Sequence, residues 1–220
     1  MKTAALLLTL TLAACASRPV PRAVVPSDSA GWVNTTFASL SLEEKVGQLI
    51  MGRLEGDFEN VKGPELQRIT RLIRNYHIGG FAVGIGSPAD VAIKLNTLQS
   101  AAKLPLLIAA DLEWGAGMRL WRPTYLPYGM EGGGGTAFPF NMGVGATADP
   151  AWADTIGRIT GKEARAVGIH WVFAPVLDVN TQPANPIVNV RSYGSDARDV
   201  ARFGSAVVAG AQRARVLTAA

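Results

Sequence analysis

Acidic and basic side chains gather where predicted apolar strands end. Asp111 and Glu113 follow an uninterrupted apolar run, and Arg119 comes after a glycine-containing turn. Asp178 closes a second apolar stretch, and Arg191 lies shortly after it. Carboxylates and guanidinium groups can hold hydroxyl groups with charge-assisted hydrogen bonds. These five residues are therefore our candidates for a binding site.

A structural alternative exists for the same five residues. Such side chains also form rings of salt bridges that tie loops together. For Asp111 and Arg191 we favour contact with a ligand, whereas for Asp178, Glu113 and Arg119 both interpretations stay open.

Short apolar segments alternate with helical segments along most of the chain. Apolar runs predict strands at about 49–54, 78–85, 105–111, 170–179 and 216–219. Helical periodicity and capping signals predict helices from Ser41 and at 63–77, 89–103, 150–167 and 196–213. In the helix 63–77 the predicted inner face is Leu66, Ile69, Ile73 and Tyr76.

Repeated strand–helix units with buried strands favour a parallel sheet covered by helices, which is an α/β fold. An open doubly wound sheet and a (β/α)₈ barrel both fit this pattern. In both folds the active site lies at the carboxyl ends of the strands, where the loops 112–146 and 180–194 are expected. A whole barrel takes about 250 residues. With only a few strand–helix units expected, a barrel here would be an N-terminal half.

Composition excludes several classes of protein. The net charge is +4 and the basic residues form no run, which argues against a nucleic-acid partner. The one cysteine, Cys15, excludes a disulfide framework and a thiolate metal site. His77 and His170 have no metal-ligand spacing, so we expect no metal. Trp152 and Trp171 are predicted core residues.

The first residues have the character of an export signal. Lys2 precedes a short apolar run that ends in Leu-Ala-Ala-Cys, which resembles a bacterial lipoprotein signal. We expect a signal peptide at 1–14, a lipid on Cys15, a Pro-rich tether at 15–38 and the folded domain at 39–220. Ala16, in place of an aspartate, favours the periplasmic face of the outer membrane or the cell surface. An ordinary secretory signal is the alternative.

The stretch 84–89 fits the dinucleotide pattern G-x-G-x-x-A between a strand and a helix. Pro88 lies inside it, and the preceding strand is not the first of the sheet. We therefore interpret the glycines as a tight turn and expect no cofactor. Trp114 and Trp121 follow Asp111, where they would either stack on a sugar ring or pack in the core.

Six segments, in order, resemble family 3 glycoside hydrolases, in particular their β-N-acetylglucosaminidase branch. They are KVGQLIM (45–51), IGGFAVG (78–84), IAADLEWGAGMR (108–119), GGTAFPFNMGVGAT (134–147), GKEARAVGIHWVFAPVLDVN (161–180) and NPIVNVRSYGSD (185–196). The resemblance covers about Leu40 to Ala220 and implies the N-terminal half of a (β/α)₈ TIM-type barrel.

The resemblance also implies roles for the candidate residues. Asp111 matches the family's aspartate that binds sugar hydroxyls in the cleavage subsite, and Arg191 matches the family's sugar-binding arginine. Arg119 matches an arginine after the glycine-rich turn. Asp178 matches a position nearer the base of the site, with a supporting role. Glu113 and Asp178 match no catalytic position of the family.

By the same resemblance the mechanism is retaining, with an aspartate nucleophile and an acid that is thought to be a histidine. Both are expected beyond Ala220, so we assign no catalytic residue here and expect the 220-residue chain to be inactive by itself. The implied substrates are N-acetylglucosamine-containing cell-wall or chitin fragments. A β-glucosidase or β-xylosidase of the same family, and a non-catalytic saccharide-binding surface lipoprotein, stay open as alternatives.

Overall fold

A computed structural model describes residues 27–125 and 131–220, and the predicted signal peptide and Cys15 lie outside them. The chain divides after Ser39 into two units, of which the second, Leu40–Ala220, contains the sheet. Helix α1 (Ser27–Ser39) belongs to the first, so part of the predicted tether is helical. The prolines of the tether end at Pro26, and the helix begins at the next residue. No helix in the described ranges is long and apolar enough to cross a membrane.

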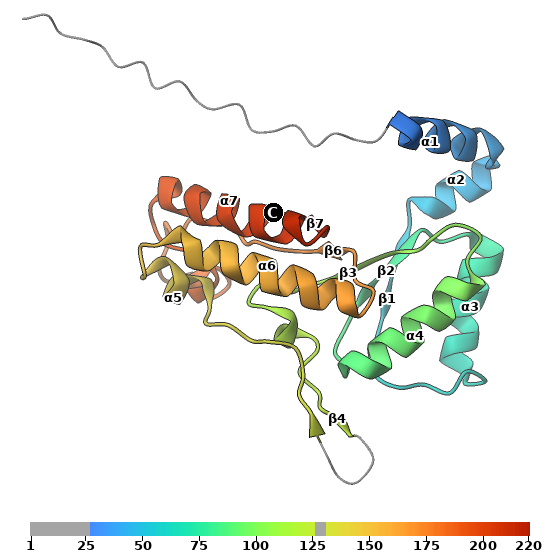
Figure 1. Ribbon diagram of the computed structural model, residues 1–220, viewed down its shortest axis with the longest axis horizontal. Helices are drawn as coiled ribbons and strands as arrows, with labels where there is room; N and C mark the ends of the chain where they lie inside the picture. The colour runs from blue at the N-terminus through green and yellow to red at the C-terminus, as the bar shows by residue number, and fades with distance from the viewer. Residues whose placement is uncertain (1–26, 126–130) are drawn as a thin grey trace, which may run out of the picture. The chain divides into compact units, whose positions relative to one another are not determined.

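Five parallel strands form the main sheet, in the order β1-β2-β3-β6-β7 (Figure 1). The strands are β1 (Met51–Leu54), β2 (Gly80–Val83), β3 (Leu107–Ala110), β6 (Trp171–Val172) and β7 (Leu217–Thr218). The order follows the chain without a reversal, whereas a doubly wound sheet needs a switch point. The sheet is therefore of the barrel type, and the predicted α/β fold with parallel strands is confirmed.

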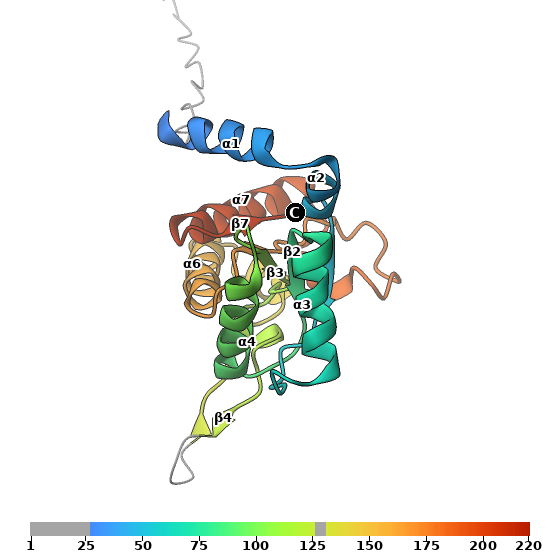
Figure 2. The ribbon, with the colours of Figure 1, turned by 90° about the vertical axis from the view of Figure 1, so that its right-hand side faces the viewer.

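A first helix precedes β1, and the following ones connect the strands of this sheet. They are α2 (Leu42–Gln48), α3 (Pro64–Tyr76), α4 (Pro88–Ala101), α6 (Pro150–Ala166) and α7 (Ala197–Arg213). Figures 1 and 2 both show α3 beside α4 and α6 beside α7. The predicted helices are confirmed to within a few residues.

Local capping signals explain why these helices begin and end where they do. Ser41 and Glu44 form a reciprocal capping box at α2. Asp149 and Asp196 cap α6 and α7 with side-chain carboxylates. Gly168 has φ 88° just after α6, a conformation that favours glycine. All these signals are visible in the sequence.

The main core lies between one face of the sheet and the helices. Alternate strand residues supply it, among them Phe81, Ile108 and Val172, and Leu66 of α3 and Leu95 of α4 pack with them. A second cluster lies between α5 (Asn141–Gly145), α6 and α7. The strand residues between those of the main core face the opposite side of the sheet, which carries the candidate site.

Several predictions were wrong in extent. The strand predicted at 170–179 is confined to Trp171–Val172, and Pro175, which has no N–H, lies just beyond it. The predicted loop 112–146 contains the 3₁₀ helix η1 (Ala116–Met118), a hairpin of β4 (Thr124–Tyr125) and β5 (Glu131–Gly132), and α5. The predicted core side chains Tyr76 and Trp152 are exposed.

Candidate functional site

Asp111 and Arg119 form an ion pair at the carboxyl end of β3. Asp111 directly follows the strand, and Arg119 follows η1, so the turn between them brings the two side chains together. The Arg119 guanidinium donates a hydrogen bond to the Asp111 carboxylate. The Asp111 side chain stays 44% exposed, so its carboxylate can accept further hydrogen bonds. A cavity of about 70 Å³, lined by both residues, lies beside the pair.

Glu113 and Arg191 form a second pair in the same region. The Arg191 Nε and Nη2 atoms each donate to one Glu113 carboxylate oxygen at 2.8 Å. This bidentate geometry raises the pKa of Arg191, and the negative charges of Asp178 and Asp111 raise it further. Glu113 is buried by the pair, with 9% of its side chain exposed, against 35% for Arg191.

Hydrogen bonds to backbone carbonyls fix the main chain at three of the candidate residues. The Gly86 N–H donates to the Arg119 carbonyl at 3.0 Å. The Asn141 side chain donates to the Arg191 carbonyl at 2.7 Å, and Asn141 itself is buried. The Ser192 hydroxyl donates to the Asp178 carbonyl at 2.6 Å. Residues from three separate loops are therefore held at one end of the sheet.

The structure brings the five predicted residues to the same region. Asp111, Glu113 and Arg119 come from the loop after β3, and Asp178 and Arg191 come from the segment after β6. Asp178 is exposed, and its charge acts on Arg191 without an ion pair between them. The predicted ring of salt bridges exists in part, as two separate pairs. Half-exposed charged groups in such pairs leave lone pairs and donors for a ligand.

The aromatic side chains after Asp111 divide into two kinds. Trp114 packs edge-on against Phe140, with ring centroids 4.8 Å apart. Trp121 is 54% exposed, and the Arg122 guanidinium lies 5.5 Å from its ring. Of the two, Trp121 therefore has the free face that stacking on a sugar would need.

The glycines of the 84–89 stretch serve close packing of the chain. A Cβ at Gly84 would overlap the Glu55 carboxylate, and one at Gly86 would overlap the Gly56 backbone. This geometry accounts for the two glycines by their close approach to residues 55 and 56, and neither has the positive φ of a turn that needs glycine. No group of three His, Cys, Asp or Glu residues within 27–125 and 131–220 is placed to hold a metal ion.

Both histidines, His77 and His170, have a structural role in the fold. His77 ends α3 with φ 54°, and the His170 Nδ1 accepts a hydrogen bond from the Ile108 N–H at 3.2 Å. Burial, assisted by the Arg165 charge, lowers the pKa of His170. His170 is thereby kept in the neutral form that can accept this bond.

Sequence reasoning did not single out Arg53, which lines the same cavity as Asp111 and Arg119. The sequence feature that could have indicated Arg53 is its position in the strand predicted at 49–54. Leu54 is buried in the core, so Arg53 must face the other side of the sheet. Arg53 therefore lies on the same face of the sheet as Ala82 of β2, beside this cavity.

Comparisons with known proteins identify the family of this chain. Residues 41–220 match the family model described as "Glycosyl hydrolase family 3 N terminal domain". A beta-N-acetylglucosaminidase/beta-glucosidase of Cellulomonas fimi is 35% identical over 181 residues, which are 82% of this chain and 29% of that protein. The chain therefore spans less than a third of that relative.

Solved structures give the same result. A beta-glucoside phosphorylase BglX bound to 2FGlc superimposes with a TM-score of 0.72 and 32% identity, over 88% of this chain and 32% of that one. A family 3 beta-N-acetylglucosaminidase from Paenibacillus sp. str. FPU-7 superimposes with a TM-score of 0.66 and is 37% identical. The match covers 82% of this chain and 32% of that one. The chain belongs to the glycosyl hydrolase family 3 and carries its N-terminal domain fold.

Proposed function

We propose that this chain supplies the sugar-binding part of a retaining family 3 glycoside hydrolase that removes terminal β-N-acetylglucosaminyl residues. The observation that carries the proposal is the half-exposed Asp111 carboxylate, fixed by Arg119 at the carboxyl end of β3. A carboxylate held in this way can accept hydrogen bonds from two neighbouring sugar hydroxyls.

The chemistry assigned to these residues is binding and orientation. A retaining glycosidase needs a nucleophile and an acid on opposite sides of the scissile bond. Asp111 is engaged by Arg119, and Glu113 is buried under Arg191. We assign neither as nucleophile or acid. Holding the sugar in a productive orientation lowers the entropic part of the barrier, which is the contribution expected from this region.

Two kinds of observation support the choice of sugar. The name of the Cellulomonas fimi relative includes both N-acetylglucosaminidase and glucosidase, and the Paenibacillus structure is a beta-N-acetylglucosaminidase. A β-glucosidase is therefore the second candidate, since the phosphorylase neighbour also acts on β-glucosides by its name. Cell-wall or chitin fragments would be the natural oligosaccharides for the first activity.

The test is hydrolysis of 4-nitrophenyl glycosides by the protein as its gene encodes it. We expect turnover of the β-N-acetylglucosaminide to exceed that of the β-glucoside and β-xyloside. Asp111→Ala should abolish turnover, whereas Asp154→Asn, in an exposed ion pair with Arg213, should not change it. A higher rate on the β-glucoside would overturn the choice of sugar. Binding of N-acetylglucosamine without turnover of any glycoside would favour a saccharide-binding protein.

We also propose that Cys15 carries a lipid that anchors the protein at the periplasmic face of the outer membrane or the cell surface. The support is the Leu-Ala-Ala-Cys sequence after a short apolar run. Growth with labelled palmitate should label the wild-type protein and leave Cys15→Ser unlabelled. Equal labelling of the two proteins would contradict the proposal.

A further inference from the structure

Arg53 shares the inner face of the sheet with Asp111. Arg53 on β1 pairs in register with Ala82 on β2, and Ala82 pairs with Ala109 on β3. Asp111 lies two residues after Ala109, so its side chain leaves the same face of the sheet one step nearer the carboxyl end. Between Arg53 and Asp111 lie Ala82 of β2 and Gly84, which follows β2, and their small size leaves a notch that Val83 also lines.

Glu55 holds the Arg53 guanidinium beside this notch. The Arg53 Nε donates to the Glu55 Oε1 at 2.9 Å, and the Nη2 lies 2.9 Å from the same oxygen. The Glu55 carboxylate lies over Gly84, so a side chain at position 84 would displace this carboxylate. The buried Lys94 donates to the Glu55 carbonyl at 2.8 Å, which fixes the backbone of that residue. Arg53 is thus paired with a residue whose backbone is fixed, and 79% of the Arg53 side chain and 57% of the Glu55 side chain are exposed.

The notch has the size and charge of a subsite for hydroxyl groups. Its volume is about 70 Å³, which leaves room for hydroxyl groups between the charged side chains. The two arginines around it are balanced by Asp111 and Glu55, so the cluster has no net charge. A hydroxyl group can donate to the Asp111 carboxylate and accept from a guanidinium, whereas an anion would meet two carboxylates.

We propose that Arg53 binds a hydroxyl group of the same neutral sugar that Asp111 holds, with Glu55 as its positioning residue. The inference rests on the proposed function, because it needs a sugar at Asp111. This contact from β1 would add to the contacts from the loops after β3 and β6. The sugar would then be held from β1 and from β3, the two strands that flank β2. Recognition of one particular hydroxyl by Arg53 would then discriminate between sugars that differ at that carbon.

The experiment compares binding of N-acetylglucosamine and its 3-, 4- and 6-deoxy analogues by NMR titration. The proteins are the wild type, Arg53→Met, Glu55→Gln and the control Arg71→Met, which alters an exposed arginine of α3. We expect Arg53→Met to weaken binding of N-acetylglucosamine about tenfold, since a charge-assisted hydrogen bond is lost. For one deoxy analogue the wild type and Arg53→Met should bind equally, because the hydroxyl that Arg53 contacts is missing.

Glu55→Gln tests the positioning role. We expect a loss of about threefold, since the guanidinium is still present but less well held. In the Arg53→Met background the Glu55 change should have no further effect. A purely structural role for Glu55 would instead give the same loss in both backgrounds, which would overturn its assignment.

The outcomes separate this inference from the proposed function. If Arg53→Met binds like Arg71→Met while Asp111→Ala loses binding, the role of Arg53 is overturned and the proposed sugar site stands. If Arg53→Met weakens every analogue equally, contact with a sugar hydroxyl is overturned. If Asp111→Ala binds N-acetylglucosamine as well as the wild type does, the proposed sugar site is overturned. The proposed contact of Arg53 with the sugar is then overturned as well.

Discussion

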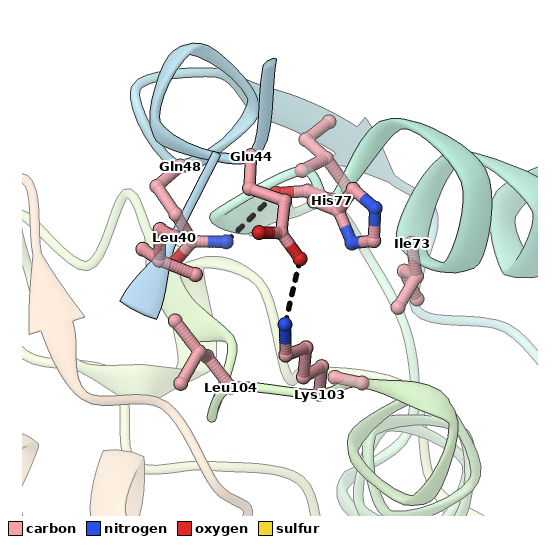
Figure 3. A pocket seen from close by; sticks show the side chains of 9 residues that line it. Leu40, Glu44, Gln48, Ile73, His77, Lys103 and Leu104 are labelled. Carbon is pink, nitrogen blue, oxygen red and sulfur yellow. Dashed lines mark hydrogen bonds and ion pairs between the residues drawn. The ribbon is translucent and has the colours of Figure 1, made fainter. Parts of the chain in front are cut away.

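The two ends of the main sheet use their polar side chains in different ways. At the amino end of β1, β2 and β3, Gln48 donates to the His77 carbonyl at 2.7 Å and Lys103 pairs with Glu44 at 2.7 Å (Figure 3). Gln99 both donates to and accepts from the backbone of Leu106, at 2.9 Å each. At this end polar groups mostly satisfy the backbone of short connections.

At the carboxyl end the charged side chains pair with one another. Arg53 with Glu55, Asp111 with Arg119 and Glu113 with Arg191 line long loops, and two of the pairs border a cavity. In barrels of this kind the carboxyl end carries function and the amino end carries stability. The amino end also has a charged pair, Lys103 with Glu44, beside a cavity of about 10 Å³. The difference is therefore that, among the residues that the structure describes, charged pairs are more numerous at the carboxyl end and border a larger cavity, of about 70 Å³.

The largest expected effect is at Asp111. Asp111→Ala should lower the affinity for N-acetylglucosamine roughly a hundredfold and abolish turnover of its nitrophenyl glycoside, because charge-assisted hydrogen bonds to the sugar are lost. The melting temperature should stay near that of the wild type, since the side chain is half exposed. A large drop in melting temperature would show that Asp111 is a structural residue like those at the amino end.

Arg191→Met should affect both binding and stability. It leaves the Glu113 carboxylate, 9% exposed, without its bidentate partner. We expect a loss of about 2 kcal/mol in the free energy of unfolding, measured by urea denaturation, together with weaker sugar binding. The double variant Arg191→Met/Glu113→Leu should recover stability and not binding. Recovery of binding as well would mean that Arg191 does not contact the sugar.

Gln99→Leu tests the opposite end of the sheet. It leaves the N–H and carbonyl of Leu106 unpaired, and that residue is 3% exposed. We expect a loss of about 1.5 kcal/mol in the free energy of unfolding with unchanged sugar binding. The control Gln67→Leu, at an exposed position of α3, should change stability by less than about 0.5 kcal/mol. Weaker sugar binding by Gln99→Leu would contradict the division between the two ends.

The smallest expected effect concerns His170. Because its pKa is lowered in the fold, the unfolded chain binds more protons as the pH falls through the unfolded value of about 6.5. Stability from the neutral form is therefore present above that pH and is lost below it. The melting temperature should fall from pH 7.5 to pH 5.5, and by less in His170→Asn, whose amide oxygen can still accept from Ile108. An equal fall in both proteins would assign the pH dependence to other groups.

The sequence predicted the helices better than the loops, for a physical reason. Caps such as Ser41 with Glu44 and Asp149 are local signals, and the structure confirms both of them. Helices η1 and α5 have no side-chain cap, so nothing local marked them inside the predicted loop. Short elements of that kind depend on tertiary contacts.

The candidate residues could be predicted, but their partners could not. The position of Asp111 after an apolar run was enough to place it at the carboxyl end of a strand. The pairing of Glu113 with Arg191 joins residues 78 positions apart and depends on how two loops meet. Arg53 was missed because a single charged residue in a short strand gives no pattern until the register with β2 is known.

The most direct test of the central claim is a map of backbone amide shifts on addition of N-acetylglucosamine. If the carboxyl end of the sheet is the sugar site, the shifts should concentrate at 84–87, 111–120 and 189–194, and Asp111→Ala should abolish them. Shifts concentrated around Gln48, His77 and Lys103 at the amino end, or shifts that persist unchanged in Asp111→Ala, would contradict the account.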